Sequence, residues 1–155
     1  MKNKKIIMIT VKFKDLNKQY RMLLTAAEKA AKTSYCPYSR FAVGAALLTR
    51  NGRIITGSNV ENASYRLTVC AEQAAIARAN ALGQRHFKAV AVIARGGNSS
   101  DRPIAPCGAC RQMLFEFFEF SGIDLEVIMS DAGKKRIVIA KISELLPLAF
   151  GPKDL

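Results

Sequence analysis

The chain has 155 residues, half of them apolar, and a net charge of +12 from 24 basic and 12 acidic side chains. This length and composition favour one globular domain with a real hydrophobic core and leave little room for a second. No apolar run reaches the roughly 20 residues that a membrane-spanning helix needs. The short run "KIIMITV" is not followed by a small-residue cleavage site. A cytoplasmic protein with no membrane partner is therefore expected.

The positive charge is concentrated at the beginning of the chain. Residues 1–32 contain nine Lys or Arg residues and, on the acidic side, Asp15 and Glu28. Such a segment could attract nucleic acid, but no aromatic residues interleave with the basic ones to form a stacking platform for bases. We therefore expect no nucleic-acid partner, a basic N-terminal extension over residues 1–14, and a single domain over residues 15–155.

The first half of the chain predicts a helix followed by a hairpin. Apolar residues recur at helical spacing within residues 14–34, and Pro37 disfavours helix in the residue before it. The apolar runs "FAVGAALLT" (41–49) and "RIITGSNV" (53–60) are strand-like. Asn51-Gly52 joins them and is a strong signal for a hairpin turn.

The second half alternates helices and strands. Gly83 ends a helix that begins near Cys70, and Ser121-Gly122 end another that begins near Cys107. The remaining segments are loops at 61–68 and 95–106, strands at 87–94, 124–130 and 135–141, a short helix at 142–147 and an extended tail at 148–155. This order predicts an α/β fold, a three-layer α-β-α sandwich around a mixed five-stranded sheet.

Cysteine residues stand at the start of two of these helices. Cys107 and Cys110 are three positions apart, so their sulfur atoms share a helix face, and Cys70 supplies a third thiol. Helix N-termini stabilise thiolates, the form that binds metal, through free N–H groups and a partial positive charge. Three thiolates leave a tetrahedral zinc ion one open position, which is typical of catalytic rather than structural zinc sites.

Other interpretations of these thiols remain open at this point. A Cys-x-x-Cys pair alone also fits a redox pair or two buried thiols. A structural zinc site would need a fourth ligand, but Cys36 and His86 have no second ligand at metal spacing nearby. Glu72 favours the catalytic interpretation, because a carboxylate beside zinc-activated water can take a proton and deliver it to a leaving group.

Taken together, these motifs resemble the cytidine deaminase family in its small homotetrameric, zinc-dependent form. The resemblance covers most of the chain and leaves out residues 1–14. Its blocks, in the order of the family, are "SYCPYSRFAVGAALLT" (34–49), "GSNVENASY" (57–65), "CAEQAAI" (70–76), "PCGACRQ" (106–112) and "LLPLAFGPKDL" (145–155).

The resemblance implies a cytidine deaminase-like fold and roles for individual residues. By this resemblance, Zn²⁺ would be bound by Cys70, Cys107 and Cys110, and protons would be transferred by Glu72. The reaction it implies is hydrolytic deamination of free cytidine and deoxycytidine to uridine and deoxyuridine plus ammonia, in pyrimidine salvage.

For the substrate, the resemblance implies that Asn59 and Glu61 bind the ribose, although by themselves they would be taken for polar loop residues that cap their own backbone. Phe41 and Phe150 would lie against the pyrimidine, with Phe150 supplied by a neighbouring subunit of a homotetramer with composite sites. The backbone around Ala71 and the Ala105 carbonyl would then hydrogen-bond the edge of the base.

Two other classes of protein share parts of this pattern. A polynucleotide-editing deaminase uses the same zinc chemistry but generally has His where this chain has Cys70, and the "NVEN" and "FGPKDL" blocks favour a free nucleoside. A non-enzymatic zinc module would have no use for Glu72.

The chain departs from the resemblance at Gln73, where the family commonly has Arg. A neutral side chain offsets less of the negative charge of three thiolates than an Arg would. We expect under-compensated thiolates, and the alternative is that Gln73 only fills space. Arg111 is the nearest cationic residue in sequence to Cys110.

Overall fold

The computed structural model describes residues 7–96 and 101–155. Within these residues, six strands form one mixed sheet in the order β1-β6-β5-β4-β2-β3. The strands are β1 (Ile9–Val11), β2 (Ala42–Thr49), β3 (Ile54–Ser58), β4 (Phe87–Arg95), β5 (Glu126–Ser130) and β6 (Ile137–Lys141). Strands β4 and β5 are parallel, and the other neighbouring pairs are antiparallel.

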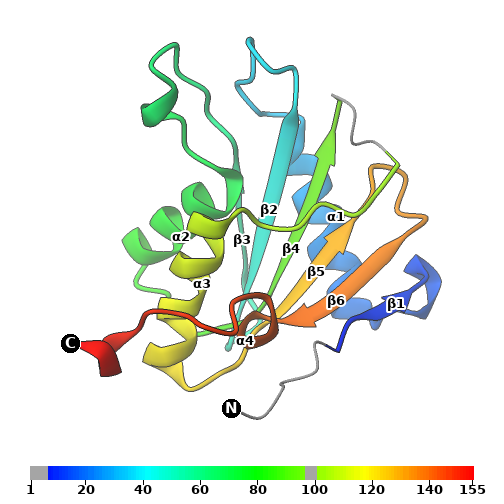
Figure 1. Cartoon of the computed structure of the whole chain (residues 1–155). Helices are drawn as coiled ribbons and strands as arrows, with labels where there is room; N and C mark the ends of the chain where they lie inside the picture. Colours follow the sequence, from blue (N-terminus) through cyan, green and yellow to red (C-terminus); the bar gives the residue numbers. More distant parts are fainter. Residues whose placement is uncertain (1–6, 97–100) are drawn as a thin grey trace.

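Helices cover both faces of the sheet. Helix α1 (Lys18–Ala31) lies on one face, and α2 (Ala71–Ala81), α3 (Gly108–Ser121) and the short α4 (Ile142–Leu145) lie on the other (Figure 1). The predicted α/β fold with a mixed sheet is confirmed. The predicted number of five strands is wrong, because the described residues contain six. None of the helices in the described segments has the length and apolar character required to cross a membrane.

The additional strand is β1, which pairs antiparallel with β6, with Ile9 opposite Ile139. The sequence does not predict this strand, because it has only three residues, lysines lie near it in the chain, and its side chains are mostly exposed. Half-buried Val11 and Phe13 pack against the core beneath α1. Part of the segment 1–14 therefore belongs to the sheet, while the boundary between a basic extension and the domain stays a prediction.

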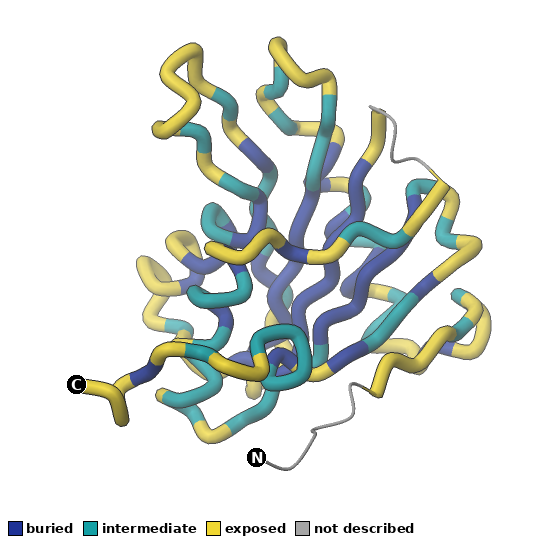
Figure 2. Tube along the Cα trace, in the orientation of Figure 1, coloured by how far each residue is buried: buried dark blue, intermediate teal, exposed yellow. Residues whose placement is uncertain are grey.

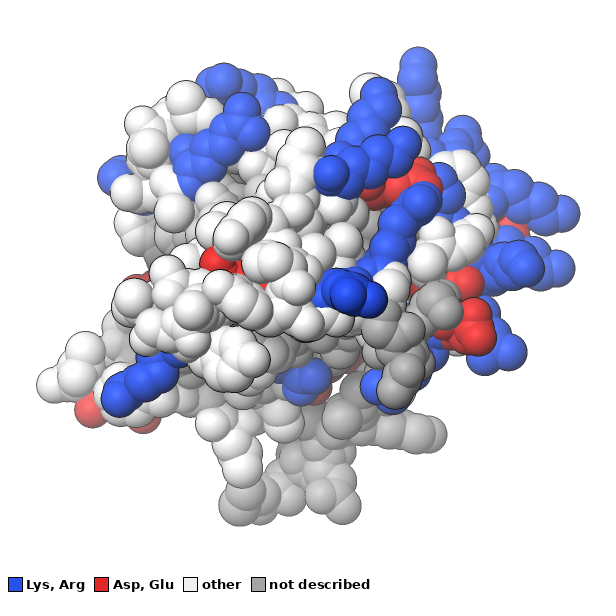
Figure 3. All heavy atoms as spheres, turned by 90° about the horizontal axis from the view of Figure 1, so that it is seen from above, with Lys and Arg blue, Asp and Glu red and all other residues white. Residues whose placement is uncertain are grey.

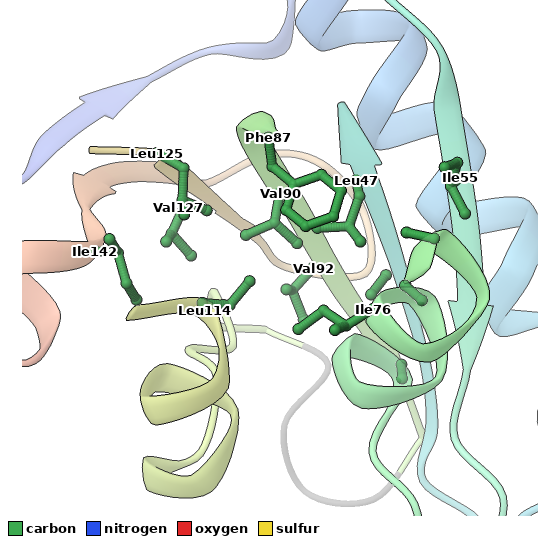
Figure 4. Packing of buried hydrophobic residues seen from close by; sticks show 14 of the residues in the cluster. Leu47, Ile55, Ile76, Phe87, Val90, Val92, Leu114, Leu125, Val127 and Ile142 are labelled. Carbon is green, nitrogen blue, oxygen red and sulfur yellow. The ribbon is translucent and has the colours of Figure 1, made fainter. Parts of the chain in front are cut away.

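The core consists of two layers separated by the sheet. Buried residues follow the strands, and exposed ones gather in the loops (Figure 2). On the side of α2 and α3, Val90 and Val92 of β4 meet Leu114 of α3 (Figure 4). On the other side, Leu23 and Leu24 of α1 are completely buried. Each such side chain contributes about 1.5–3 kcal/mol by leaving water.

Two glycines let the helices lie directly on the strands. A Cβ atom on Gly44 of β2 would lie 2.0 Å from the Ala27 carbonyl oxygen of α1. A Cβ atom on Gly57 of β3 would lie 2.4 Å from the Ala75 nitrogen of α2. No larger residue fits at either position without moving a helix, so Gly57 fixes how α2 sits on the sheet.

The sheet also determines where α2 and α3 begin. Strands β3 and β4 are both antiparallel to β2, so they run in the same direction. Helix α2 follows β3 and helix α3 follows β4 along the chain. Both helices therefore start at the same edge of the sheet, beyond the carboxyl ends of the strands, where α/β proteins commonly bind ligands.

Candidate active site

Three thiols meet at these two helix starts. Cys70 is the N-cap residue of α2, Cys107 is the N-cap residue of α3, and Cys110 lies in the first turn of α3. Their sulfur atoms all lie within 4.8 Å of one another, and those of Cys70 and Cys107 are 4.0 Å apart. A tetrahedral zinc ion with bonds of about 2.3 Å places two sulfur ligands about 3.8 Å apart. The three thiols therefore fit a zinc ion.

The two residues considered as a fourth zinc ligand, Cys36 and His86, lie outside this cluster. A metal ion of this kind needs at least three His, Cys, Asp or Glu side chains close together. Among residues 7–96 and 101–155, the three thiols form the one group of this kind. His86 instead packs against Phe120, with ring centroids 5.3 Å apart. A three-thiol site with a position left for water or substrate matches the catalytic rather than the structural kind.

The thiols also influence one another's protonation. The hydrogen bond from Cys110 outweighs burial and lowers the pKa of Cys70 to about 7. The same hydrogen bond, together with burial, raises the pKa of Cys110. The cluster thus stabilises a thiolate, the form that binds metal.

A cavity of 320 Å³ opens directly beside this cluster. Cys70, Cys107 and Glu72 all line it, while Cys110 is completely buried. Glu72 lies in the first turn of α2 and is only 4% exposed. Burial raises the pKa of this carboxyl group. Helix α2 therefore brings a candidate metal ligand and a buried carboxylate to one cavity.

The same cavity is lined by five of the six residues expected at the substrate: Phe41, Asn59, Glu61, Ala71 and Ala105. The Asn59 side chain accepts from the Val43 N–H (2.8 Å) and donates to the Phe41 carbonyl (2.9 Å). Asn59 therefore binds the backbone at the start of β2 rather than that of its own loop, and it lines the cavity as well.

Glu61 is held by the loop that precedes β2. Its carboxylate accepts from the Tyr38 N–H (3.0 Å), the Ser39 N–H (3.2 Å) and the Ser39 hydroxyl. The hydrogen bond from the Ser39 hydroxyl is the main reason why the pKa of Glu61 lies below its ordinary value. Glu61 is therefore fixed in place at the wall of the cavity in its charged form.

The structure does not bring Phe150 into this cavity. Its side chain is 58% exposed, and its carbonyl accepts from the Gln112 side chain on α3 (2.8 Å). The ion pair between Lys153 and Glu119 also holds the tail against α3. A role for Phe150 in the site of a neighbouring subunit stays a prediction.

The structure also defines the surroundings of Gln73 and Arg111. Gln73 is half-buried in the first turn of α2. The Arg111 guanidinium donates to the carbonyls of Pro106 (2.8 Å) and Leu145 (3.1 Å). Arg111 therefore binds backbone oxygens. The expectation that Gln73 leaves the negative charge of the thiolates under-compensated stays a prediction.

Several residues that line the cavity were not singled out from the sequence: Ser39, Val43, Thr68, Val69, Val92 and Ile104. Val43 and Val92 belong to apolar strands, which look like ordinary core in a sequence. Ser39 and Thr68 lie in loops where polar residues are expected anyway. Only the spatial arrangement distinguishes them from their neighbours.

Basic residues are unevenly distributed around this end of the molecule. Lys and Arg gather mainly over one side, and uncharged residues cover most of the other (Figure 3). Part of the positive charge of the protein is neutralised, because Glu28 forms ion pairs with both Arg95 and Lys134.

Comparisons with known proteins agree on one family. The family model described as "cytidine and deoxycytidylate deaminase zinc-binding region" matches residues 17–121. The cytidine deaminase of Halalkalibacterium halodurans is 44% identical over 135 residues, which span 87% of this chain and 96% of that protein.

Solved structures give the same result. The crystal structure of cytidine deaminase from Burkholderia pseudomallei is 42% identical in sequence with a TM-score of 0.75, over 84% of this chain and 98% of that one. The crystal structure of cytidine deaminase from Mycobacterium tuberculosis has 38% identity and a TM-score of 0.69, over 87% of this chain and 99% of that one.

Proposed function

This chain belongs to the cytidine deaminase family, and from this membership we propose that it hydrolyses free cytidine and deoxycytidine to uridine and deoxyuridine with release of ammonia. The observation that carries the proposal is one cavity lined by two of the three clustered thiols, by Glu72, and by Phe41, Asn59 and Glu61. The groups that would bind the metal, transfer protons and bind the substrate are therefore within reach of one small molecule.

Cys70, Cys107 and Cys110 would hold the zinc ion. Their sulfur separations fit tetrahedral ligation, and they lie at the starts of two helices, where negatively charged groups are favourable. A zinc ion held there supplies a Lewis acid that lowers the pKa of water.

Glu72 would carry the protons. Its carboxylate takes a proton from the attacking water and delivers it to ring N3 of the cytosine as the oxygen adds to C4. It then moves the proton of the new C4 hydroxyl to the amino group, so that the C4–N bond breaks, a C4=O bond forms and ammonia leaves. Its burial in the first turn of α2 supports this role, because a side chain packed there stays aimed at one point.

Other residues that line the cavity would bind the rest of the nucleoside. Glu61 and Asn59 would hydrogen-bond the sugar hydroxyls, which both donate and accept. Phe41 would lie against the pyrimidine, an arrangement worth about 1–3 kcal/mol per base in other nucleic-acid sites. The backbone around Ala71 and Ala105 would hydrogen-bond the edge of the base and so orient C4.

We further propose a homotetramer with composite sites, in the cytoplasm, acting in pyrimidine salvage. Exposed apolar residues beside the cavity support a partner subunit there: Tyr35, Tyr38, Val60, Tyr65 and Leu67 are each between 48% and 74% exposed. Clusters of exposed apolar surface commonly mark interfaces. The exposed Phe150 on the C-terminal tail is available to reach a neighbouring subunit.

One set of assays separates this proposal from its rivals. Purified protein with measured zinc content is given free cytidine in one reaction and single-stranded DNA in another. Conversion of cytidine alone supports a nucleoside deaminase. Conversion of cytosine in DNA would indicate a polynucleotide-editing enzyme, and bound zinc without either activity would indicate a non-enzymatic zinc module.

A further inference from the structure

We propose that Ser39 is a positioning residue, which holds the Glu61 carboxylate in the orientation that binds the sugar hydroxyls of the substrate. The inference rests on the proposed function, in which Glu61 binds the sugar. Ser39 lies in the loop between α1 and β2, and it lines the cavity together with Glu61.

The two oxygens of Glu61 are held differently. Oε2 accepts from two backbone donors, the Tyr38 N–H at 3.0 Å and the Ser39 N–H at 3.2 Å. Oε1 accepts from the Ser39 hydroxyl. Since each carboxylate oxygen has about two acceptor positions, the bonds on Oε2 use both of its positions and leave one free on Oε1. The oxygen left for a ligand is therefore the one that Ser39 orients.

The hydroxyl of Ser39 is itself oriented by the loop. Its oxygen accepts from the Phe41 N–H at 3.0 Å, so its single proton points toward Glu61. Arg40 makes this possible, because its left-handed backbone conformation (φ 53°) turns the chain sharply between Ser39 and Phe41. One hydroxyl thus links the proposed sugar-binding carboxylate to the residue proposed to contact the base.

Removal of this hydroxyl has a specific consequence. The backbone bonds to Oε2 do not depend on the side chain at position 39, so Glu61 stays at the cavity wall. Its Oε1 atom loses its fixed direction, and the substrate must then order it on binding, which weakens affinity. Because Glu61 would contact only the sugar, the loss should affect recognition of the sugar hydroxyls and not the chemical step.

The test compares cytidine with 2′,3′-dideoxycytidine, which lacks both hydroxyls, as substrates of the full-length, zinc-loaded protein. Ser39→Ala should raise the KM for cytidine by up to about tenfold, the upper end of the cost of ordering one side chain on binding. The kcat should change little, and the KM for the dideoxy substrate should stay nearly constant. The KM ratio, defined as the KM for dideoxycytidine divided by the KM for cytidine, should therefore fall. A general packing defect would raise both KM values and preserve this ratio.

Ser121→Ala is a matched control. The Ser121 hydroxyl also donates to one oxygen, the Phe117 carbonyl (2.7 Å), and accepts from the N–H two residues later, that of Ile123 (3.2 Å). It does not line the cavity, so its loss should leave the KM ratio unchanged. Ser39→Thr, which keeps the hydroxyl, should restore most of the wild-type ratio.

The effect of Ser39→Ala on the KM ratio should also depend on the Glu61 carboxylate. In a Glu61→Gln background, Ser39→Ala should produce no further change in the ratio. Ser39→Cys provides the same comparison with a weaker donor if the alanine variant does not fold. An unchanged ratio in a folded Ser39→Ala or Ser39→Cys variant would overturn the proposal for Ser39 alone. Absence of cytidine turnover in the wild-type protein would overturn the proposed function, and the inference with it.

Discussion

The sulfur atoms of Cys70 and Cys107 lie 4.0 Å apart, although 37 positions separate the two residues in the chain. They meet because β3 and β4 run in the same direction and each is followed by a helix that begins at the same edge of the sheet. The candidate metal site is therefore a product of sheet topology as well as of the Cys-x-x-Cys motif.

Removal of one of these thiols should remove the metal. Wild-type protein should contain about one zinc ion per chain, and Cys107→Ala should lose it together with cytidine turnover, because two thiols do not complete a site of this kind. Elemental analysis of the purified proteins measures the zinc. Cys36→Ala is the control, since Cys36 lies outside the cluster and its removal should leave the zinc content unchanged. Full zinc occupancy in Cys107→Ala would rule out this ligand set.

The ion pairs of Glu28 should stabilise the fold in a pH-dependent way. Burial alone would raise the pKa of Glu28, but the hydrogen bonds and charges of Lys134 and Arg95 outweigh burial and lower it. The folded-state pKa thus lies below the unfolded one, so the stabilisation is present at neutral pH and is lost as the pH falls through the folded-state pKa.

Glu28→Gln should accordingly lower the free energy of unfolding at pH 7 by about 1 kcal/mol. In urea unfolding, the difference from wild type should shrink in strongly acidic buffer. Glu119→Gln is the control, because its partner Lys153 is 86% exposed and an exposed pair contributes little. A difference for Glu28→Gln that is equally large at both pH values would contradict the ion-pair explanation.

The N-terminal segment should matter for stability and not for catalysis. Deletion of residues 1–14 removes β1 and the packing of Val11 and Phe13, so Tm should fall by about 5 °C. Cytidine turnover well below Tm should stay nearly unchanged. Replacement of Lys12 and Lys14 by Gln is the control, since it removes charge and keeps β1. Tight, salt-dependent binding to single-stranded DNA that disappears on the deletion would instead reveal a nucleic-acid function.

The C-terminal tail should contribute to the site of a neighbouring subunit. Deletion of residues 147–155 removes Phe150, so it should raise the KM for cytidine sharply and loosen the proposed tetramer. Light scattering and steady-state kinetics on the same samples measure both effects. If the full-length protein is a fully active monomer, Phe150 has no such role.

Some features of the fold could be predicted from the sequence because local signals were strong. The helix expected from Cys107 to the Ser121-Gly122 pair is α3, and Gly122 ends it in a left-handed conformation (φ 68°). Strand β1 could not be predicted, because three residues carry too little pattern and the strand depends on pairing with β6.

The candidate site likewise contains residues that can be predicted from the sequence and residues that cannot. Cys70, Glu72 and Cys107 stand in motifs whose spacing already points to metal chemistry, and the structure brings them to one cavity. Ser39 carries no such signal, because its proposed role rests on a hydrogen bond to Glu61, 22 positions away. Contacts of this kind depend on how distant loops meet, which a single sequence does not specify.

The most direct test of the account compares cytidine hydrolysis by the wild-type protein and by Glu72→Gln at matched zinc content, with uridine and ammonia both quantified. The wild-type protein should release one ammonia per uridine formed. Glu72→Gln should keep its zinc and lose about 10²–10⁴-fold or more in kcat, because it lacks the group that carries the proton. A zinc-loaded Glu72→Gln variant that deaminates cytidine at nearly the wild-type rate would contradict the central claim.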